Sequence, residues 1–338
     1  MRSTTRPTTT ALLAASALLV TGCGGSSTGA EDTTTEVQAE TVTFEWDRNV
    51  AAEDQDPQLE ETTTEVPKNP ETIVVFDMAS LDTIGALGGE VAGAPLDSVP
   101  DYLSDHLADD AFNAGTLFEA DLVEIEAQQP DLIVIGGRSA ALYEDLSEIA
   151  PTVDLSMRGS FIETLESNAT FLGEVLGAEE EAAAAIDRIE AGIEEARQVT
   201  ADAGTGLGIM VSGGELSALS PAGADAAGRG ARGGLIYDTF GVQPVVEDIQ
   251  AATHGEPVSF EFLLETDPDH LWVVDRDAAT NAEGAQAAAA VLDNEIVRQT
   301  AAAQNDQIHY LDPTAWYIVF GGIETAQIMI DDVLQSAE

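Results

Sequence analysis

Residues 73–94 read Ile73-Val-Val-Phe-Asp-Met-Ala-Ser-Leu-Asp-Thr-Ile-Gly-Ala-Leu-Gly-Gly-Glu-Val-Ala-Gly-Ala94. We predict a buried strand over 73–76, a helix over 79–87 that the glycine pair ends, and a second strand over 91–94. A short helix over 122–128 and an apolar strand over 132–135 continue the alternation. Strands that alternate with helices in this way are typical of parallel β-α-β units, so the sequence predicts an α/β fold.

A long helical stretch with a break at Gly177 follows over 161–199, and the alternation of strand and helix restarts after Gly204. We therefore predict two α/β halves joined by one long helix. The later strands are expected over 207–211, 271–274 and 308–311, and the later helices over 233–240, 285–292 and 323–334. The expected division is a signal peptide over 1–22, a tether over 23–40, an N-terminal lobe over 41–157, an interlobe helix over 158–202 and a C-terminal lobe over 203–338.

Two further segments precede the first predicted strand of the α/β alternation. Val42-Thr-Phe-Glu-Trp46 alternates apolar and polar residues, and Thr62-Thr-Thr-Glu-Val66 is rich in threonine. Such segments favour strands, and the acidic residues between them suit a loop. The sequence predicts an opening hairpin.

The N-terminus carries the pattern of an export signal. Arg2 and Arg6 precede an apolar run over 11–20, and small residues lead to Cys23, the only cysteine of the chain. Ten apolar residues are too few to span a bilayer as a helix. The segment Val20-Thr-Gly-Cys23 resembles a lipobox, after which cleavage leaves the cysteine as the acylated N-terminus. We expect an exported protein, held at the outer face of the cell membrane through a lipid on Cys23.

The composition is strongly acidic. Asp and Glu number 62 against 12 Lys and Arg, which gives a formal net charge of −50 over 338 residues. This balance argues against a nucleic acid or an anionic membrane surface as the partner. Arginines are scarce, so each one in the folded part of the chain is a candidate for a specific role.

Three arginines stand where an anion could bind. Arg138 and Arg276 each follow an apolar strand, one in each half, and ligands of open α/β sheets bind at the carboxyl ends of the strands. Arg232 lies in a glycine-rich segment just before a predicted helix, where backbone N–H groups favour an anion. Any one arginine could instead pair with a nearby carboxylate. Three at matching positions predict a cationic cleft.

An ordered series of motifs runs from Pro67 to the C-terminus. The motifs are residues 67–83, Pro130-Asp-Leu-Ile-Val-Ile-Gly-Gly-Arg138, residues 147–152, Thr253-His-Gly255, Val273-Val-Asp-Arg276, residues 292–294 and Leu311-Asp-Pro-Thr-Ala-Trp-Tyr317. This series resembles the ferric-siderophore-binding lipoproteins of iron ABC importers, in the branch that takes catecholate and petrobactin-like siderophores. The family has two Rossmann-like lobes bridged by a rigid helix, with the ligand in the cleft between the lobes.

The resemblance also implies roles for individual residues. Arg138, Arg232 and Arg276 match the arginines that contact the anionic ferric catecholate, and His254 and Tyr317 match residues that can complete the coordination of iron. The loop over 220–234 is longer than the family pattern, so Arg229 could share or take over the role of Arg232. Fe(III) would enter only as a siderophore complex, with no intrinsic cofactor, and the protein would act as a monomer.

A membrane permease is the implied protein partner. Proteins of this fold dock on the permease through one carboxylate per lobe. Glu261 matches the position in the C-terminal lobe. In the N-terminal lobe Val123 occupies the expected position, so Glu124 or Glu119 would have to substitute.

Two other classes remain open from the sequence alone. One is a binding protein of the same fold for haem, cobalamin or another metal complex. The other is an exported α/β enzyme, for which the chain shows no Gly-x-Ser-x-Gly, His-Glu-x-x-His or P-loop motif.

Overall fold

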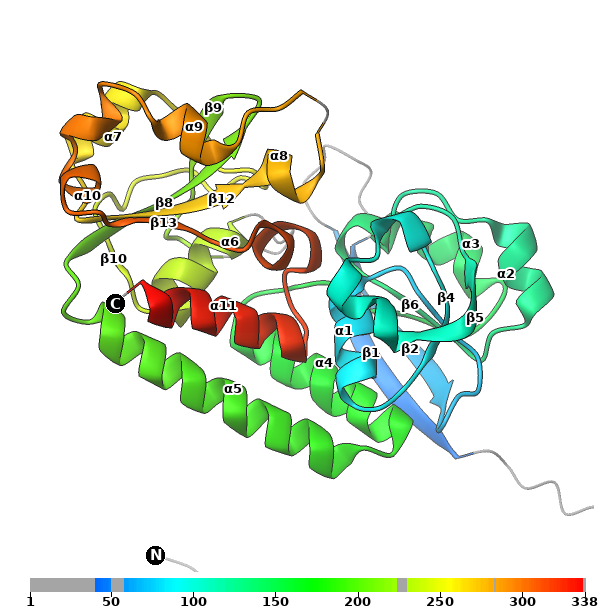
Figure 1. Cartoon of the computed structure of the whole chain (residues 1–338). Coiled ribbons are helices and arrows are strands. Elements are labelled where there is room, and N and C mark those ends of the chain that lie inside the picture. The colour runs from blue at the N-terminus through cyan, green and yellow to red at the C-terminus, as the bar shows by residue number, and fades with distance from the viewer. Residues whose placement is uncertain (1–39, 50–57, 224–229, 283, 337–338) are drawn as a thin grey trace, which may run out of the picture. The chain divides into compact units, whose positions relative to one another are not determined.

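The computed structural model of the chain describes residues 40–49, 58–223, 230–282 and 284–336, which belong to one compact unit. The predicted signal peptide over 1–22, Cys23 and Arg229 lie outside the described residues. Two large sheets with helices packed around them, and a separate two-stranded hairpin, form the described part (Figure 1). The predicted α/β class is confirmed.

The first sheet is built from residues 73–154 and has five parallel strands in the order β5-β4-β3-β6-β7. Every residue of its strands β3 and β6 is buried, which explains their unbroken apolar sequences. In the register of the sheet, Val74 pairs with Gly93 on one side and Ile133 on the other. The strands are β3 (Ile73–Val75), β4 (Val91–Ala94), β5 (Leu107–Asn113), β6 (Leu132–Ile135) and β7 (Thr152–Asp154).

The second sheet follows residue 204 and has the order β11-β9-β8-β12-β13, with β10 paired to β8. Strands β10, β8, β12 and β13 are parallel. At one side β9 pairs antiparallel with β8, and β11 pairs antiparallel with β9. The strands are β8 (Thr205–Ser212), β9 (Glu215–Ala218), β10 (Gln243–Pro244), β11 (Glu256–Val258), β12 (His270–Asp275) and β13 (Ile308–Tyr310).

The predicted opening hairpin is confirmed. Strands β1 (Thr41–Asn49) and β2 (Leu59–Pro67) pair antiparallel, with Val42 opposite Val66 and Trp46 opposite Thr62. Val42, Trp46 and Val66 are buried, so one face of the hairpin packs on the protein.

The predicted break at Gly177 in the joining segment is confirmed, but it separates two distinct helices instead of interrupting a single long one. The helices are α4 (Phe161–Leu176) and α5 (Glu179–Thr200), which pack along each other (Figure 1). Gly177 ends α4 in the left-handed conformation with φ 66°, and a left-handed residue cannot continue an α-helix. The C-terminal helix α11 (Ile323–Gln335) lies against both α5 and α1 (Met78–Ala86).

The remaining helices are short. The predicted helix over 122–128 is confirmed as α2, whereas the helix predicted over 285–292 starts only at Ala288. The α-helices are α2 (Leu122–Gln128), α3 (Tyr143–Ser147), α6 (Ala231–Gly234), α7 (Phe260–Thr266), α8 (Arg276–Ala279), α9 (Ala288–Leu292) and α10 (Ala301–Gln304); the 3-10 turns are η1 (Leu96–Ser98), η2 (Asp101–His106), η3 (Gly137–Leu142) and η5 (Val297–Gln299); the π turns are η4 (Leu235–Thr239) and η6 (Thr314–Val319).

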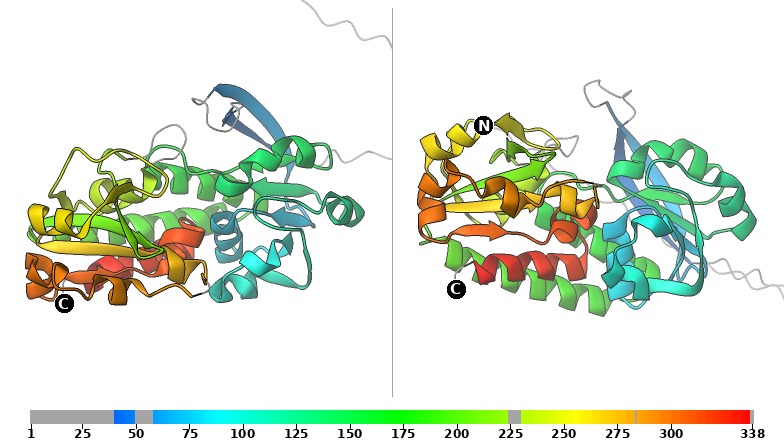
Figure 2. Two further views of the ribbon diagram at one scale, coloured as in Figure 1. Left: turned by 90° about the horizontal axis from the view of Figure 1, so that it is seen from above. Right: turned by 45° about the horizontal axis from the view of Figure 1, so that its top comes forward.

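A single apolar cluster connects the helices with one face of each sheet. It includes Val75 and Val134 of the first sheet, Val274 of the second, and the fully buried Trp316 of η6. Two smaller clusters cover the other faces of the two large sheets. Figure 2 shows the two large sheets and their helices from two further directions. Among the described residues no helix is both long enough and apolar enough to cross a bilayer.

Candidate functional site

The two strand-end arginines occupy equivalent positions in an internal repeat. Helix α2 is followed by Pro130, strand β6 and Arg138, and helix α7 is followed in the same spacing by Pro268, strand β12 and Arg276. Each helix ends in a left-handed residue directly before its proline. Both arginines therefore project from the carboxyl end of a central parallel strand, where open α/β sheets bind ligands.

The third arginine, Arg232, is held by a glycine-rich turn. It is the second residue of α6, after Gly230 with φ 84°. Gly233 packs so closely on Ser220 that a Cβ atom would lie 1.9 Å from the Ser220 carbonyl oxygen. The glycines thus allow α6 to approach the end of β9, and this approach fixes the position of Arg232.

The three arginines converge on Tyr317, although they come from distant parts of the chain. Their guanidinium carbons lie 5.5 Å (Arg138), 4.8 Å (Arg232) and 5.5 Å (Arg276) from the centroid of the Tyr317 ring. Arg232 also lies 4.9 Å from the ring centroid of Phe320. Cations are attracted to the faces of aromatic rings, so the rings stabilise this gathering of positive charge.

Backbone carbonyl groups of η6 hold two of the arginines. Arg138 donates to the carbonyl oxygens of Tyr317 (2.9 Å) and Ile318 (3.0 Å), and Arg232 donates to those of Trp316 (3.1 Å) and Tyr317 (3.1 Å). A third bond joins Arg232 to the Thr253 carbonyl oxygen at 3.3 Å. The last carbonyl groups of a helical turn lack partners within the turn, which leaves them free for these bonds.

The positive charge of the cluster is not neutralised by direct ion pairs. Within the part of the chain that the structure describes, the ion pairs involve other basic residues and none joins Arg138, Arg232 or Arg276 to a carboxylate. Burial and the neighbouring charges of Arg138 and Arg276 lower the pKa of Arg232 to about 10. The Arg232 guanidinium group still remains protonated at neutral pH, so the cluster suits an anion.

His254 and Tyr317 form a pair of metal-ligand type beside the arginines. The His254 Nε2 atom lies 3.2 Å from the Tyr317 hydroxyl oxygen. Burial and then the charges of Arg276, Arg232 and Arg138 lower the pKa of His254, which favours the neutral imidazole that can bind a metal. When two ligand atoms bind one metal ion at right angles, each ~2.1 Å from the ion, they lie ~3 Å from each other. The separation of the two atoms therefore fits adjacent positions on one ion.

The structure brings five of the predicted site residues together: Arg138, Arg232, Arg276, His254 and Tyr317. Sequence reasoning missed the contacts of Ser212, Phe320 and the Thr253 carbonyl group. Ser212 accepts a hydrogen bond from Arg276 at 2.9 Å, and Arg276 also donates to the Tyr317 hydroxyl at 2.7 Å. Ser212 could not be found from a sequence motif. It lies far from Arg276 in the chain, and only the pairing of β8 with β12 brings the two residues together.

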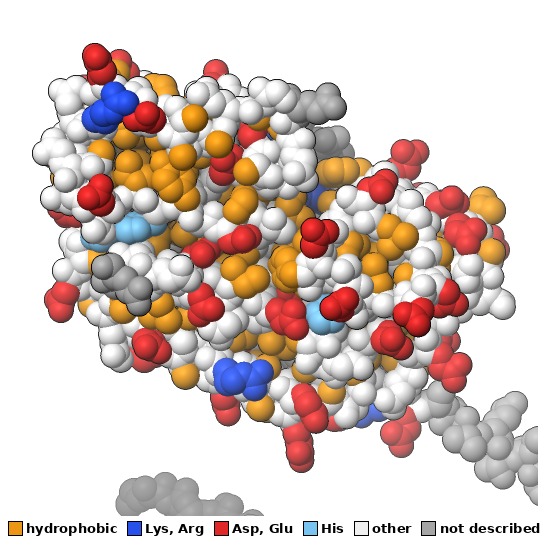
Figure 3. Space-filling model, viewed as in Figure 1, with side chains coloured by type: hydrophobic (Ala, Val, Ile, Leu, Met, Phe, Trp, Pro, Cys, Tyr) orange, Lys and Arg blue, Asp and Glu red, His pale blue; other side chains and the backbone are white. Residues whose placement is uncertain are grey.

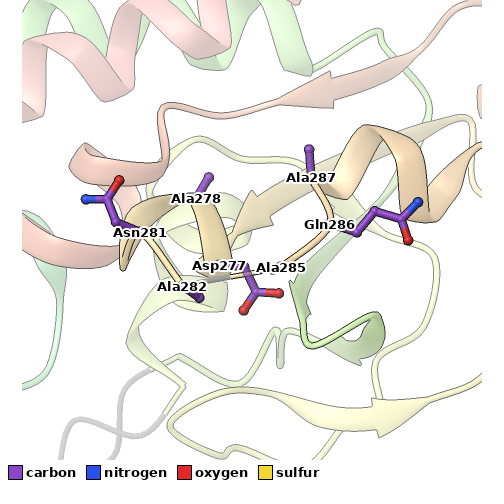
Figure 4. Close-up of a pocket in the computed structure, with 7 residues that line it drawn as sticks. All are labelled: Asp277, Ala278, Asn281, Ala282, Ala285, Gln286 and Ala287. Atoms are coloured by element: carbon purple, nitrogen blue, oxygen red, sulfur yellow. The ribbon is translucent and has the colours of Figure 1, made fainter.

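The chain directly after Arg276 lines a hollow of about 360 Å³. The hollow is lined by seven residues between Asp277 and Ala287, in α8 and the segment after it (Figure 4). Most of the lining side chains are alanine, and Asn281 and Gln286 supply amide groups. None of these seven side chains is basic, so the hollow differs in character from the cluster around Tyr317.

The predicted permease-contacting carboxylates are not part of the cluster. Glu261 is exposed in the first turn of α7, where its own backbone N–H and then the Ser259 hydroxyl lower the pKa of its carboxylate. In the internal repeat Val123 takes the equivalent place in α2 and is 81% exposed. Glu119 is exposed before α2, and Glu124 is half-buried and accepts from Gln128. Figure 3 shows acidic side chains scattered over the visible face, with few Lys and Arg between them.

These features define the class of the protein: an α/β binding protein with two sheets and a cationic site formed by both halves of the chain. The sequence profile of the family described as Periplasmic binding protein matches residues 73–315. The chain belongs to this family, and the predicted resemblance is confirmed. Membership also bears out the prediction of a binding protein rather than an enzyme.

Individual relatives agree with this assignment. The Petrobactin-binding protein YclQ of Bacillus subtilis (strain 168) is 33% identical over 326 residues, which cover 95% of this chain and 96% of the relative. The Ferric-anguibactin-binding protein FatB of Vibrio anguillarum is 30% identical, with 80% of this chain and 84% of FatB covered. The crystal structure of a TroA-like periplasmic binding protein from Xylanimonas cellulosilytica matches with a TM-score of 0.85 and 72% identity, over 88% of this chain and 99% of that chain.

Proposed function

We propose that this protein captures a ferric siderophore, of the catecholate type, and delivers it to the permease of an ABC importer. The observation that carries the proposal is the cluster of three arginines around Tyr317 and His254, without direct ion pairs in the described part of the chain. The relatives named for petrobactin and ferric anguibactin support the same class of ligand.

The chemistry of the ligand explains the cluster. A tris-catecholate complex of Fe(III) is strongly anionic, and the planar guanidinium group can donate to paired oxygens. Arg138 and Arg276 each use two nitrogen atoms on protein acceptors, so each keeps further N–H groups for a ligand. The iron is cargo and arrives with its own oxygen ligands.

His254 and Tyr317 have a second role in the proposal. Fe(III) is a hard cation that favours phenolate-type oxygen, and imidazole is an acceptable ligand for iron. Where a siderophore supplies only four donor atoms, the Tyr317 oxygen and the His254 nitrogen fill the two open positions. Where the siderophore supplies six, both residues only contact the complex.

The cellular setting completes the proposal. The protein is exported, cleaved before Cys23 and tethered by a lipid on Cys23 to the outer face of the cell membrane. It works as a monomer, and its permease contacts are Glu261 in the C-terminal lobe and Glu124 or Glu119 in the N-terminal lobe. The acidic surface in Figure 3 fits docking through carboxylates.

The test compares an anionic with a neutral iron complex. Arg138→Ala and Arg276→Ala should each weaken binding of a ferric tris-catecholate by ~1.5–3 kcal/mol, the range for a hydrogen bond to a charged group. Binding of a neutral ferric hydroxamate should change much less. Arg158→Ala is the matched control, because Arg158 already pairs with Asp154 at 2.6 Å. Equal losses for both complexes in folded protein would refute the proposed role of the cluster.

A further inference from the structure

Asp277 is a buried carboxylate that the proposed function does not use. It directly follows Arg276 in α8 and is 7% exposed. One carboxylate oxygen accepts from the Ser212 hydroxyl at 3.1 Å, and the other accepts from the backbone N–H of Gly213 at 2.6 Å. In Figure 4 its side chain points away from that of Ala278. Asp277 therefore joins α8 to the end of β8.

The Ser212 hydroxyl connects Asp277 to the arginine cluster. It accepts from Arg276 Nη1 at 2.9 Å. Because an ionised carboxylate can only accept, the Ser212 proton must be directed to Asp277. The hydroxyl group is thereby fixed with its oxygen toward Arg276. The result is a chain of hydrogen bonds from Asp277 through Ser212 and Arg276 to the Tyr317 hydroxyl.

Arg276 differs from its two neighbours in the way it is held. Arg138 and Arg232 are bound by backbone carbonyl groups, whose positions the fold itself sets. The hydrogen bonds of Arg276 in the described structure go instead to two side chains, Tyr317 and Ser212. A side-chain hydroxyl can rotate, so it positions a guanidinium group only if something else fixes its own orientation.

An indirect link has an advantage over an ion pair. A carboxylate in direct contact with Arg276 would take two of its N–H groups and compete with an anionic ligand. Through Ser212 the carboxylate uses one. Within the described residues, Ser212 and Tyr317 engage two of the five N–H groups of Arg276, and the other three can donate to a ligand.

We propose that Asp277 is a positioning residue for the ligand site, which orients Arg276 through the Ser212 hydroxyl group and leaves its remaining N–H groups free for an anion. The inference rests on the proposed function for the identity of the anion, but not for the link between Asp277 and Arg276.

The binding test is a double-mutant cycle with iron(III) tris-catecholate as the probe. Asp277→Asn and Ser212→Ala should each weaken binding about tenfold, the equivalent of a typical hydrogen bond. Ser212→Thr should bind like the wild type, because it keeps the hydroxyl group. In an Arg276→Ala background, Asp277→Asn should have no further effect. Asp275→Asn is the matched control, since the Asp275 carboxylate accepts from the backbone N–H groups of Ala278 and Ala288, whereas the Arg276 side chain donates to Tyr317 and Ser212. Undiminished binding by Asp277→Asn, or the same loss with and without Arg276, would overturn the proposal.

A second measurement needs no ligand. The NMR exchange rate of the Arg276 Nε–H proton should rise in Asp277→Asn and in Ser212→Ala, and stay unchanged in Asp275→Asn. Unchanged exchange in the first two variants overturns the link itself. Faster exchange in a protein that binds no anionic iron complex supports the link and refutes the proposed function.

Discussion

Asp82 offers a sharp test of how the two halves of the chain are held together. It is fully buried in α1 and accepts from the backbone N–H groups of Glu324 and Thr325, both at 2.8 Å, and from the Thr325 hydroxyl at 2.6 Å. These N–H groups belong to the first turn of α11, where backbone N–H groups have no partner within the helix. Gly322 packs on the same carboxylate, where a Cβ atom would lie 2.5 Å from Asp82 Cγ. Asp82 thus caps a helix that is more than two hundred residues away in sequence.

We predict that Asp82→Ala lowers the free energy of unfolding by about 2–4 kcal/mol. The loss of a buried, charge-assisted cap leaves donors without partners, and this cost is only partly offset by the cost of burying the carboxylate itself. The assay is denaturant unfolding at neutral pH. The matched control is Asp331→Ala on the exposed side of α11, where Asp331 accepts from Gln327. This substitution should change the free energy of unfolding by less than about 0.5 kcal/mol. Equal stability of the two variants would refute the reasoning.

The pH dependence of Asp82 gives a second readout. Burial raises the pKa of Asp82 from 3.8 to about 6. Between pH 4 and pH 6 the folded state therefore holds a proton that the unfolded chain has released. The stability gained from this protonation is complete below pH 4 and is lost as the pH rises through 6. The difference in stability between the wild type and Asp82→Asn should shift against the wild type by ~3 kcal/mol over this range. A difference that does not change with pH would contradict the assignment.

Three further predictions concern other residues. The double variant His254→Ala, Tyr317→Phe should lose affinity for tetradentate bis-catecholate iron complexes and largely keep hexadentate ones, as measured by fluorescence quenching; parallel losses would show that neither residue binds iron. Glu261→Lys should abolish siderophore-dependent uptake by cells while leaving affinity in solution intact, and normal uptake at normal surface abundance would remove Glu261 from the permease contact. Burial and His270 lower the pKa of His309 from 6.5 to about 4, so its contribution to stability is complete above pH 6.5 and is lost as the pH falls toward 4; His309→Gln should unfold with a weaker pH dependence in that window, and an unaltered profile would count against this explanation.

Much of the fold follows from local sequence signals. The buried strands β3, β6 and β12 are continuous apolar runs, and such runs are typical of parallel strands covered on both faces. Strand β5 was missed because its sequence, Leu-Ala-Asp-Asp-Ala-Phe-Asn, lies at the edge of the first sheet with two exposed aspartates. An edge strand is selected for solubility as well as for pairing, which weakens its apolar pattern.

The site was predictable in its parts but not in its connections. Arg138 and Arg276 could be found because the carboxyl end of a parallel strand is recognisable from sequence. The hydrogen bond between Ser212 and Asp277 could not, because 65 residues separate them and only the pairing of β8 with β12 brings them together. The convergence of three arginines on Tyr317 likewise depends on how η6 packs between the two halves. Individual positions were predictable, whereas contacts between distant segments required the fold.

The most direct test of the central claim is a titration of the purified wild-type protein with an iron(III) tris-catecholate, followed by visible absorbance and tryptophan fluorescence. We predict saturable binding of one complex per chain, a broad charge-transfer band from the bound complex, and affinity at least about tenfold higher than for a neutral ferric hydroxamate, because charge-assisted hydrogen bonds favour the anion. Absence of binding, equal affinity for the neutral complex, or purification with a tightly bound pigment that shows a Soret band would contradict the account.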